Sequence, residues 1–513
     1  MVALSFYGAQ AVHASHTMSV RIKAFAPVTL PAKNCVRHMH EAPCYDVALF
    51  VSPRWAARSE WLKTFRFILA LVILLGPAAS GARAQVVPNE VQPPVSVSPL
   101  PSVDGTNATA DDVLPQTEEQ PSFNHQGVLV EKLSGETVRD QAADQPFNPA
   151  SAVKLATTFA ALRIFGPKYR FATTVWINGT FDKTTGTVSG DLIVSGRDPS
   201  FHDEHAVAVA RELNQLGIKT VTGDLIVAPR FSMNFSPSSQ HSGERLYDTL
   251  DAERRPTAAT RAWYESRMAL HDTKALRTTP SVAVMGAVYV DAVPKGARAI
   301  STHYSPALVD VLKVLLCYSN NFMAERLGDQ LGGAGGVMRV LSNDLGFKAG
   351  EFHLASTSGL GTNRMTPRQM LKLYRALLDE LHKGDLKAAD ILPVAGVDPG
   401  TLQRRYAASP SRGSVIAKTG TLPRTDGGAS ALVGQLRTRD GNTLLFVILD
   451  QRGSITRFRQ WQDALVAELQ NARGGPLPFT YAPQTLAIRL STSEFDSARS
   501  STLDEYEPTT PNQ

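Results

Sequence analysis

Three short polar motifs, far apart along the chain, constrain the fold more than any other feature. Residues 151–154 form an S-x-x-K, residues 319–321 an S-x-N, and residues 418–420 a K-T-G. The flanking apolar pattern places the first at a helix start, the second between two helices and the third on a strand. If the motifs act together, the fold must bring these three kinds of element to one place.

The S-x-x-K motif supplies a candidate nucleophile, Ser151, and its base, Lys154. Residues three apart on a helix share a face, so the lysine amine can reach the serine hydroxyl. A serine hydroxyl is a weak nucleophile until a base accepts its proton. The lysine can be that base only if burial or another cation lowers its pKa. For this motif alone, a surface lysine near a serine is the alternative.

The other two motifs carry groups that suit an acyl-transfer reaction. The Ser319 hydroxyl can relay a proton toward a leaving amine, and the Asn321 amide can hold a substrate carbonyl. Lys418 and Thr419 suit a free carboxylate, while Gly420 lets a substrate backbone approach the strand edge. Taken singly, Ser319 also suits a helix cap and Lys418 a strand end. The order of the three motifs favours an acyl-serine site.

The remaining pattern predicts an α+β fold with an antiparallel sheet and a helical subdomain around these motifs, interrupted by an inserted mainly-β domain. Strands are expected near residues 127–130, 137–138, 415–417, 431–436 and 444–449, and helices at 152–162, 305–386 and 456–471. Ser305-Pro306 and Thr366-Pro367 read as helix starts.

An apolar run at residues 67–75 indicates export. Basic residues precede it and Ala82-Arg83-Ala84 follows, as in a secretory signal peptide. The run is too short to span a bilayer comfortably, which takes roughly 20 residues, so cleavage after Ala84 is favoured over an uncleaved anchor. We therefore expect a periplasmic protein with no stable membrane span after cleavage. Because about fifty residues precede the signal, we expect translation to begin near residue 50.

These patterns divide the chain into six predicted parts. They are an N-terminal extension (1–53), the signal peptide (54–84), a disordered linker (85–122), the catalytic domain (123–172 and 294–484), an inserted α+β domain (173–293) and a disordered tail (485–513).

Composition excludes several classes of function. The net charge of +5 includes no long basic run, so no nucleic-acid partner is expected. The 12 histidines form no H-E-x-x-H or paired metal-ligand spacing, so we predict no metal and no cofactor. After cleavage only Cys317 would remain, which rules out an intrachain disulfide and favours a packing role for this thiol.

Residues 148–155 (Asn-Pro-Ala-Ser-Ala-Val-Lys-Leu) resemble the nucleophile region of the D-Ala-D-Ala carboxypeptidase/endopeptidase family, the class C low-molecular-mass penicillin-binding proteins. The similarity resumes around residues 318–325, 358–360 and 417–422 and covers about residues 127–466. The 165 positions from Lys154 to Ser319 leave room for the inserted domain typical of this family. The resemblance implies a β-lactamase/transpeptidase-like catalytic domain.

The resemblance also implies a role for each site residue. Peptidoglycan stem peptides would be the substrates, and β-lactams would acylate the serine and leave slowly. The implied roles are nucleophile for Ser151, base for Lys154, site lining for Ser319 and Asn321, substrate binding for Lys418, Thr419 and Gly420, and an oxyanion hole from the backbone N–H groups of Ser151 and Thr421.

The segment before S-x-N departs from the larger members of the family. Those members carry a Trp/Asp-rich stretch and a further subdomain, whereas residues 236–280 are polar and read as irregular. Carboxypeptidase and endopeptidase activity therefore both remain open, as do the stem-peptide diamino acid and the oligomeric state. A serine β-lactamase is one alternative, although the chain lacks the Glu-x-x-Leu-Asn of class A enzymes. A wall-binding protein without turnover is another.

Overall fold

The computed structural model describes residues 125–497. The predicted N-terminal extension, signal peptide and linker lie outside the described residues, as does the end of the predicted tail. Among the residues described, no helix combines the length and the apolar character needed to cross a membrane.

A five-stranded antiparallel sheet forms the centre of the catalytic part, in the order β10-β11-β12-β1-β2. The sheet joins both ends of this part, because β1 pairs with β12 and Val128 lies opposite Ile448. Both of its faces are buried by apolar side chains. The strands are β1 (Gln126–Lys132), β2 (Thr137–Gln141), β10 (Val415–Leu422), β11 (Ala429–Arg437) and β12 (Thr443–Gln451).

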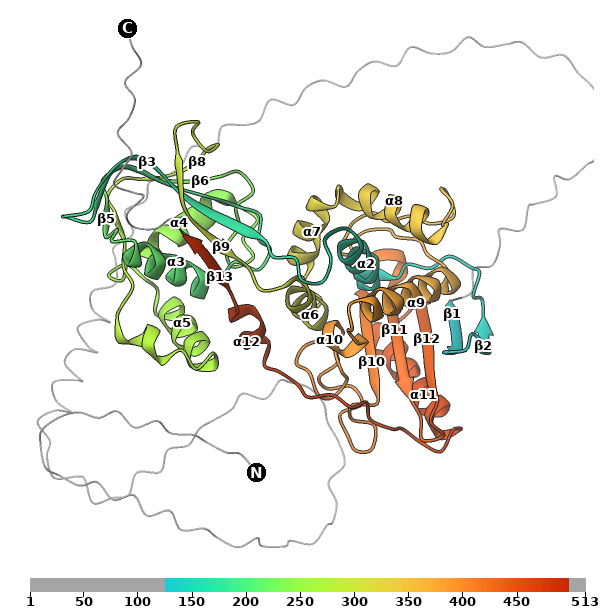
Figure 1. Ribbon diagram of the computed structural model, residues 1–513. Coiled ribbons are helices and arrows are strands. Elements are labelled where there is room, and N and C mark those ends of the chain that lie inside the picture. The colour runs from blue at the N-terminus through green and yellow to red at the C-terminus, as the bar shows by residue number, and fades with distance from the viewer. Residues whose placement is uncertain (1–124, 498–513) are drawn as a thin grey trace, which may run out of the picture. The chain divides into compact units, whose positions relative to one another are not determined.

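Helices cover the two faces of this sheet (Figure 1). On one face, α9 (Pro367–Lys383) contacts the strands and packs on α2 (Lys154–Phe165). The other face packs against α11 (Ile455–Asn471). The helical subdomain also contains α6 (Leu308–Tyr318), α7 (Asn321–Gln330), α8 (Gly333–Leu345) and the short α10 (Ala388–Ile391).

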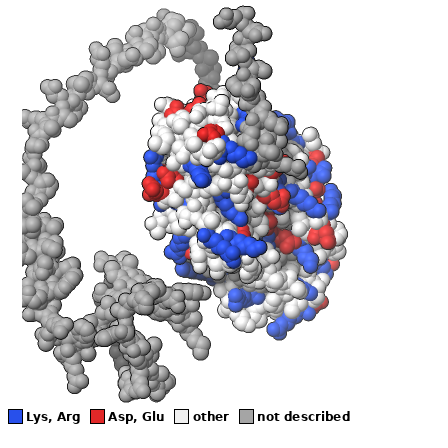
Figure 2. Space-filling view, turned by 60° about the vertical axis from the view of Figure 1, so that its left-hand side comes forward, with Lys and Arg blue, Asp and Glu red and all other residues white. Residues whose placement is uncertain are grey.

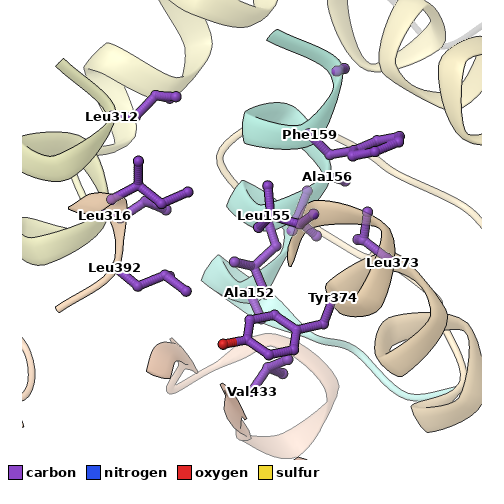
Figure 3. Close-up of a cluster of buried hydrophobic side chains, with 14 of the residues drawn as sticks. Ala152, Leu155, Ala156, Phe159, Leu312, Leu316, Leu373, Tyr374, Leu392 and Val433 are labelled. Carbon is purple, nitrogen blue, oxygen red and sulfur yellow. The ribbon is translucent and has the colours of Figure 1, made fainter. Parts of the chain in front are cut away.

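The helix that follows Ser151 runs through the middle of the largest apolar core (Figure 3). Leu155 and Phe159 of α2 point toward side chains from α6, α9 and β11, including Leu316 and Tyr374. Leu155 is fully buried, and truncating such a side chain typically costs about 2–5 kcal/mol. This packing fixes the helix start that carries the nucleophile motif.

The inserted part forms a second sheet with its own core. Eight strands take part, and buried residues of α3 and α4 cover the apolar side chains of β3, β4 and β6. The elements are β3 (Ala172–Asp182), β4 (Thr187–Gly196), α3 (Asp203–Gln215), β5 (Thr220–Val221), β6 (Leu225–Val227), α4 (Ser239–Leu250), α5 (Thr257–Ala269), β7 (Ala283–Val284), β8 (Val288–Val290), β9 (Arg298–Tyr304) and β13 (Glu494–Ser497). The α+β prediction with an inserted domain is confirmed.

Residues 236–280 are not irregular as predicted, because they contain α4 and α5. Ser238 caps α4 by accepting a hydrogen bond from the backbone N–H of His241. Leu246, Leu250 and Trp263 are buried, and half of the other residues of these helices are exposed, although several small or polar residues such as Ser242 and Ala259 are buried as well. A few apolar residues at helical spacing were enough to anchor these helices. The polar composition of the segment masked that spacing in the sequence.

The predicted tail is ordered over its first part. Helix α12 (Leu486–Ser491) buries Leu486 and Leu490 against the helical core. Strand β13 pairs antiparallel with β9, with Glu494 opposite Tyr304. The prediction of disorder from residue 485 is therefore wrong up to residue 497. Because β9 also pairs with β3, the second sheet extends past the predicted boundary at residue 293.

Of the two predicted helix starts, one is right. Thr366 caps α9 in a capping box with Gln369, and Pro367 is the first helical residue. Helix α6 begins at Leu308 rather than after Ser305. The Ser305 hydroxyl instead accepts from the backbone N–H of Phe171 and donates to the carbonyl of Pro306. The hydroxyl that was expected to cap the helix is thus occupied by a hydrogen bond to a residue distant in sequence.

Candidate active site

The three motifs meet in one groove of about 740 Å³. Ser151 lies in a short 3-10 helix, η2 (Ala150–Val153), which leads directly into α2. Ser319 ends α6 and Asn321 begins α7, while Thr419 and Thr421 lie on β10. All five side chains line the groove. The lysines of the first and third motifs are fully buried behind it.

The amine of Lys154 lies within reach of the Ser151 hydroxyl. Its Nζ donates to Ser151 Oγ at 3.1 Å, to Asn321 Oδ1 at 2.7 Å and to the Ser358 carbonyl at 2.6 Å. All three acceptors are uncharged. Burial lowers the pKa of Lys154 from its ordinary 10.5 to about 7, against an opposing effect of the Glu325 carboxylate. A substantial fraction of the amine is therefore neutral and able to accept a proton near neutral pH.

A second buried amine, that of Lys418, contacts the middle motif. Its Nζ donates to Ser319 Oγ at 2.8 Å and to the Thr419 carbonyl at 2.6 Å. Burial, and then repulsion from Lys154, hold the pKa of Lys418 well below its usual range. The two lysines thus place two hydroxyl groups, Ser151 and Ser319, each beside its own amine.

The backbone between α6 and α7 positions Ser319 and Asn321. Ser319 closes α6 in the left-handed conformation, with φ of 54°, which is uncommon for a residue other than glycine and recurs at functional sites. Asn320 then caps α7 by accepting from the backbone N–H of Met323 at 3.0 Å. The tight turn presents Ser319 and Asn321 to the same groove.

A polar network holds the backbone just before Ser151. Ala150 has φ of 47°, and its N–H donates to Asn148 Oδ1 at 3.0 Å. The Asn148 amide donates to Asp426 Oδ2 at 2.7 Å. Asp426 forms a two-pronged ion pair with Arg364, at 2.8 and 2.9 Å. The Arg364 guanidinium holds the pKa of the Asp426 carboxyl below its usual range.

Two glycines allow other segments to approach the loop that precedes Ser151. A Cβ on Gly359, which has φ of 87°, would collide with the Ala150 carbonyl. A Cβ on Gly420 would collide with the Pro149 carbonyl. Both positions therefore require glycine for a close backbone approach. For Gly420, the segment that approaches closely is a loop of the protein itself, at Pro149.

Glu325 is a site residue to which sequence reasoning gave no role. Its carboxylate accepts from the Thr357 hydroxyl at 2.8 Å and from the Ser358 N–H at 2.9 Å. Burial alone would raise the pKa of Glu325, but these hydrogen bonds outweigh it and lower the pKa. The Glu325 carboxylate thus positions Ser358 through its N–H, and the carbonyl of the same residue accepts from Lys154. The carboxylate does not contact the amine itself.

Glu325, Ser358 and Asn148 all lie within the stretches that carry the family resemblance. Their place in these stretches was the one sequence signal that could have identified them as site residues. Arg364 and Asp426 lie outside those stretches, so only the folded structure reveals that they belong to this site.

Cys317 and a histidine cluster lie outside the groove. Cys317 is fully buried in the helical core, and burial raises the pKa of its thiol to about 12, which fits packing. His202, Glu204 and His205 come within 4.8 Å of one another, a grouping that the sequence did not reveal. His205 accepts from the His202 N–H and donates to the Leu490 carbonyl, so neither ring nitrogen is free for a metal.

The fold and the site define a penicillin-binding-protein class of molecule: a sheet and a helical subdomain that enclose two serines, each beside its own buried lysine. The sequence profile of the D-Ala-D-Ala carboxypeptidase 3 (S13) family matches residues 109–243 and 249–472. The chain belongs to this family, and it is a D-Ala-D-Ala peptidase that acts on peptidoglycan.

Relatives with assigned names agree with this family. The chain is 25% identical over 380 residues to the carboxypeptidase DacB of Mycolicibacterium smegmatis, covering 68% of this chain and 81% of that protein. It is 25% identical over 448 residues to a D-alanyl-D-alanine carboxypeptidase of Actinomadura, covering 68% and 82%.

Solved structures share the fold. The predatory peptidoglycan endopeptidase Bd3459 of Bdellovibrio bacteriovorus superposes with a TM-score of 0.57 at 22% identity, covering 70% of this chain and 95% of that chain. Penicillin-binding protein 4 of Haemophilus influenzae, complexed with a β-lactam, gives a TM-score of 0.51 at 22% identity, covering 68% and 97%.

Proposed function

We propose that the protein is a serine-type D-Ala-D-Ala carboxypeptidase with endopeptidase activity, exported to the periplasm, with Ser151 as its nucleophile. One observation carries the proposal. The buried amine of Lys154 lies 3.1 Å from Ser151 Oγ, and its pKa is lowered to about 7. Such an amine can accept the serine proton near neutral pH, which an ordinary lysine cannot.

Acylation begins when Ser151 Oγ attacks the carbonyl carbon of the penultimate D-alanine. The neutral amine of Lys154 accepts the hydroxyl proton as the new C–O bond forms. The backbone N–H groups of Ser151 and Thr421 are assigned to the oxyanion hole, where they stabilise the negative charge of the tetrahedral intermediate. Lys418 and Thr419 bind the terminal carboxylate and so align the scissile bond.

Collapse of the intermediate breaks the C–N bond. The Ser319 hydroxyl, hydrogen-bonded to Lys418, delivers a proton to the departing nitrogen, which leaves as the amine of D-alanine. The proton that Lys154 took from Ser151 then replaces the one that Ser319 gave up, which leaves the Lys154 amine neutral again. Water attacks the ester, Lys154 accepts a proton from that water, and the lysine donates it to Ser151 Oγ as the ester C–O bond breaks. A β-lactam follows the same first step, but its departing nitrogen stays tethered to the acyl group, so the acyl-enzyme persists.

Relatives support both activities and β-lactam acylation. Two curated relatives are named carboxypeptidases, and the structurally similar Bd3459 is named an endopeptidase and has been solved acylated by penicillin G. The export proposal rests on the signal-like segment ending at Ala84. N-terminal sequencing of the exported protein should find Gln85 first, and an N-terminus before residue 84 would contradict it.

The function is tested with three reagents on the purified protein and its Ser151→Ala variant. A muropeptide ending in D-Ala-D-Ala should release D-alanine, and a fluorescent penicillin should label the protein stably. Both signals should vanish in the variant, which keeps the fold because Ser151 is only partly buried. Nitrocefin should turn over slowly.

Each alternative has its own outcome in this assay. Fast nitrocefin turnover would identify a β-lactamase. Stable labelling without peptide cleavage would identify a wall-binding protein. If the wild-type protein is neither labelled by penicillin nor able to cleave the muropeptide, the proposed chemistry is refuted.

A further inference from the structure

The groove that contains Ser151 continues past β10 to a rim of arginines. Arg404 and Arg459 line it together with Thr421. Arg459 lies on α11, and its guanidinium donates to the Thr421 hydroxyl at 3.0 Å. Both arginine side chains are exposed to solvent. The rim is therefore open to a ligand that occupies the groove.

The pairing of charges at this rim is uneven. Arg405 also lines the groove, but it is held by Asp463 at 2.6 Å, so its charge is balanced. Neither Arg404 nor Arg459 pairs with a carboxylate within residues 125–497. On the face that Figure 2 shows, acidic and basic side chains are intermixed. Guanidinium groups inside a groove that have no carboxylate partner are of the kind that binds carboxylates.

The position of the rim relates it to one side of the reaction. In the proposed mechanism, Lys418 and Thr419 hold the carboxylate of the residue that leaves. Thr421 follows Thr419 by two positions on β10, so their side chains lie on the same face of the strand, and both line the groove. Arg459 contacts the Thr421 hydroxyl directly, and Arg404 lines the same groove. The arginines thus lie on the side of β10 where the Thr419 hydroxyl would hold the leaving carboxylate.

A terminal D-alanine cannot occupy this part of the groove, because it ends at the carboxylate that Lys418 and Thr419 hold. The groove, at about 740 Å³, is large enough for a much bigger ligand. In a crosslinked substrate, the leaving amine belongs to the diamino acid of a second stem peptide. That peptide continues beyond the cleaved bond and carries further carboxylates.

We propose that Arg404 and Arg459 form a second carboxylate subsite that binds the leaving stem peptide, so that the enzyme prefers crosslinks to terminal D-alanine. This inference rests on the proposed function and assigns the endopeptidase activity to particular residues. Two charge-assisted hydrogen bonds at an exposed rim should change the rate on crosslinks about tenfold.

The test measures kcat/KM for three substrates with the full-length wild-type protein and the variant Arg404→Gln/Arg459→Gln. The substrates are a D-Ala-D-Ala pentapeptide, a crosslinked muropeptide dimer, and the same dimer with the carboxylates of its leaving stem amidated, except any carboxylate next to the leaving amine, which Lys418 and Thr419 would hold. The control variant is Arg457→Gln, which removes an exposed charge from α11 two residues away, outside the groove.

The variant should cleave the dimer about tenfold more slowly than wild type and the pentapeptide within about twofold. Amidation should slow the wild-type protein by a similar factor and have little further effect on the variant, because both changes remove the same contact. Arg457→Gln should change neither rate by more than about twofold.

Two outcomes would overturn the subsite. Equal losses on pentapeptide and dimer would place the arginines in the common substrate site or in the fold. An unchanged rate on the dimer would show that no leaving-group carboxylate binds there. Failure of the proposed function looks different, because the wild-type protein would then cleave neither substrate and remain unlabelled by penicillin, and the inference would fail with it.

Discussion

Buried lysines occur in two regions of the molecule, and the groups that contact their amines differ between the two. In the helical core, Lys313 donates to Asp398 Oδ2 at 2.7 Å and to the carbonyls of Ala389 and Leu392. Its amine also lies 4.9 Å from the Tyr481 ring centre. In the groove, Lys154 and Lys418 are equally buried, yet their amines contact only hydroxyl, amide and carbonyl oxygens.

The difference separates a structural charge from a reactive one. A carboxylate beside a buried ammonium stabilises the charged form and offsets its desolvation. Neutral oxygens orient the amine but compensate the charge less, so burial shifts the equilibrium toward the neutral base. The nearest acid to Lys154, Glu325, is held away from the amine by its bonds to Thr357 and Ser358. The groove thereby keeps one amine basic and uncharged.

The largest effect should come from replacing the reactive lysine. Lys154→Met should lower the rate of acylation by penicillin about a thousandfold, because within residues 125–497 no other basic side chain contacts Ser151. The thermal midpoint should stay the same or rise, since a buried amine is replaced by an apolar chain of similar length. Stopped-flow labelling and calorimetry measure the two quantities. A large loss of stability would show that Lys154 is structural, like Lys313.

The opposite pattern is expected for the structural lysine. Lys313→Met should reduce the free energy of unfolding by about 3–5 kcal/mol, because Asp398 is left buried without its partner. The folded fraction should keep its acylation rate. Adding Asp398→Leu should recover much of the stability. If the single variant is as stable as wild type in urea titrations, the ion pair does not hold this core together.

The smallest effect concerns pH. Because the pKa of Lys154 is about 7, acylation should fall as pH drops through 7, where the amine becomes protonated. Glu325 raises this pKa, so Glu325→Gln should move the midpoint lower. A glutamine can still accept from the Ser358 N–H, and its amide can donate to the Thr357 hydroxyl. A midpoint that moves higher, or not at all, would mean that Glu325 acts only through the loop.

Stability supplies an independent check on the same group. Above pH 7 the folded protein holds Lys154 neutral, whereas the unfolded chain keeps it protonated up to about 10.5. The unfolded state therefore binds more protons in this window, and stability from this residue rises with pH between about 7 and 10.5. Lys154→Met should lose that rise.

Sequence reasoning located the motifs because their signal is local. The spacing of Ser151 and Lys154 within one helical turn suffices to predict their contact, and Thr366 caps its helix as predicted. It could not identify Asp426 as a partner of Asn148, since 278 positions separate them and only the fold brings them together. The Ser305 hydroxyl was misread for the same reason, because it bonds Phe171.

Two predictions were wrong for a different reason: that residues 236–280 are irregular and that the chain is disordered from residue 485. The apolar content of both segments is low, and their order depends on partners supplied by other elements. Leu490 is buried only because the helical core receives it, and β13 forms only because β9 offers a free edge. The composition of a segment shows how much apolar surface it can bury, but not whether another element provides a surface on which to bury it.

The pairing of β1 with β12 has a consequence for how the enzyme matures. A chain synthesised from its amino end delivers Ser151 long before Lys418, and the central sheet closes only when β12 arrives. Contacts so distant in sequence form late in folding. Until then Ser151 faces no finished groove. The order of synthesis itself keeps the hydroxyl inert until the whole catalytic part has been made.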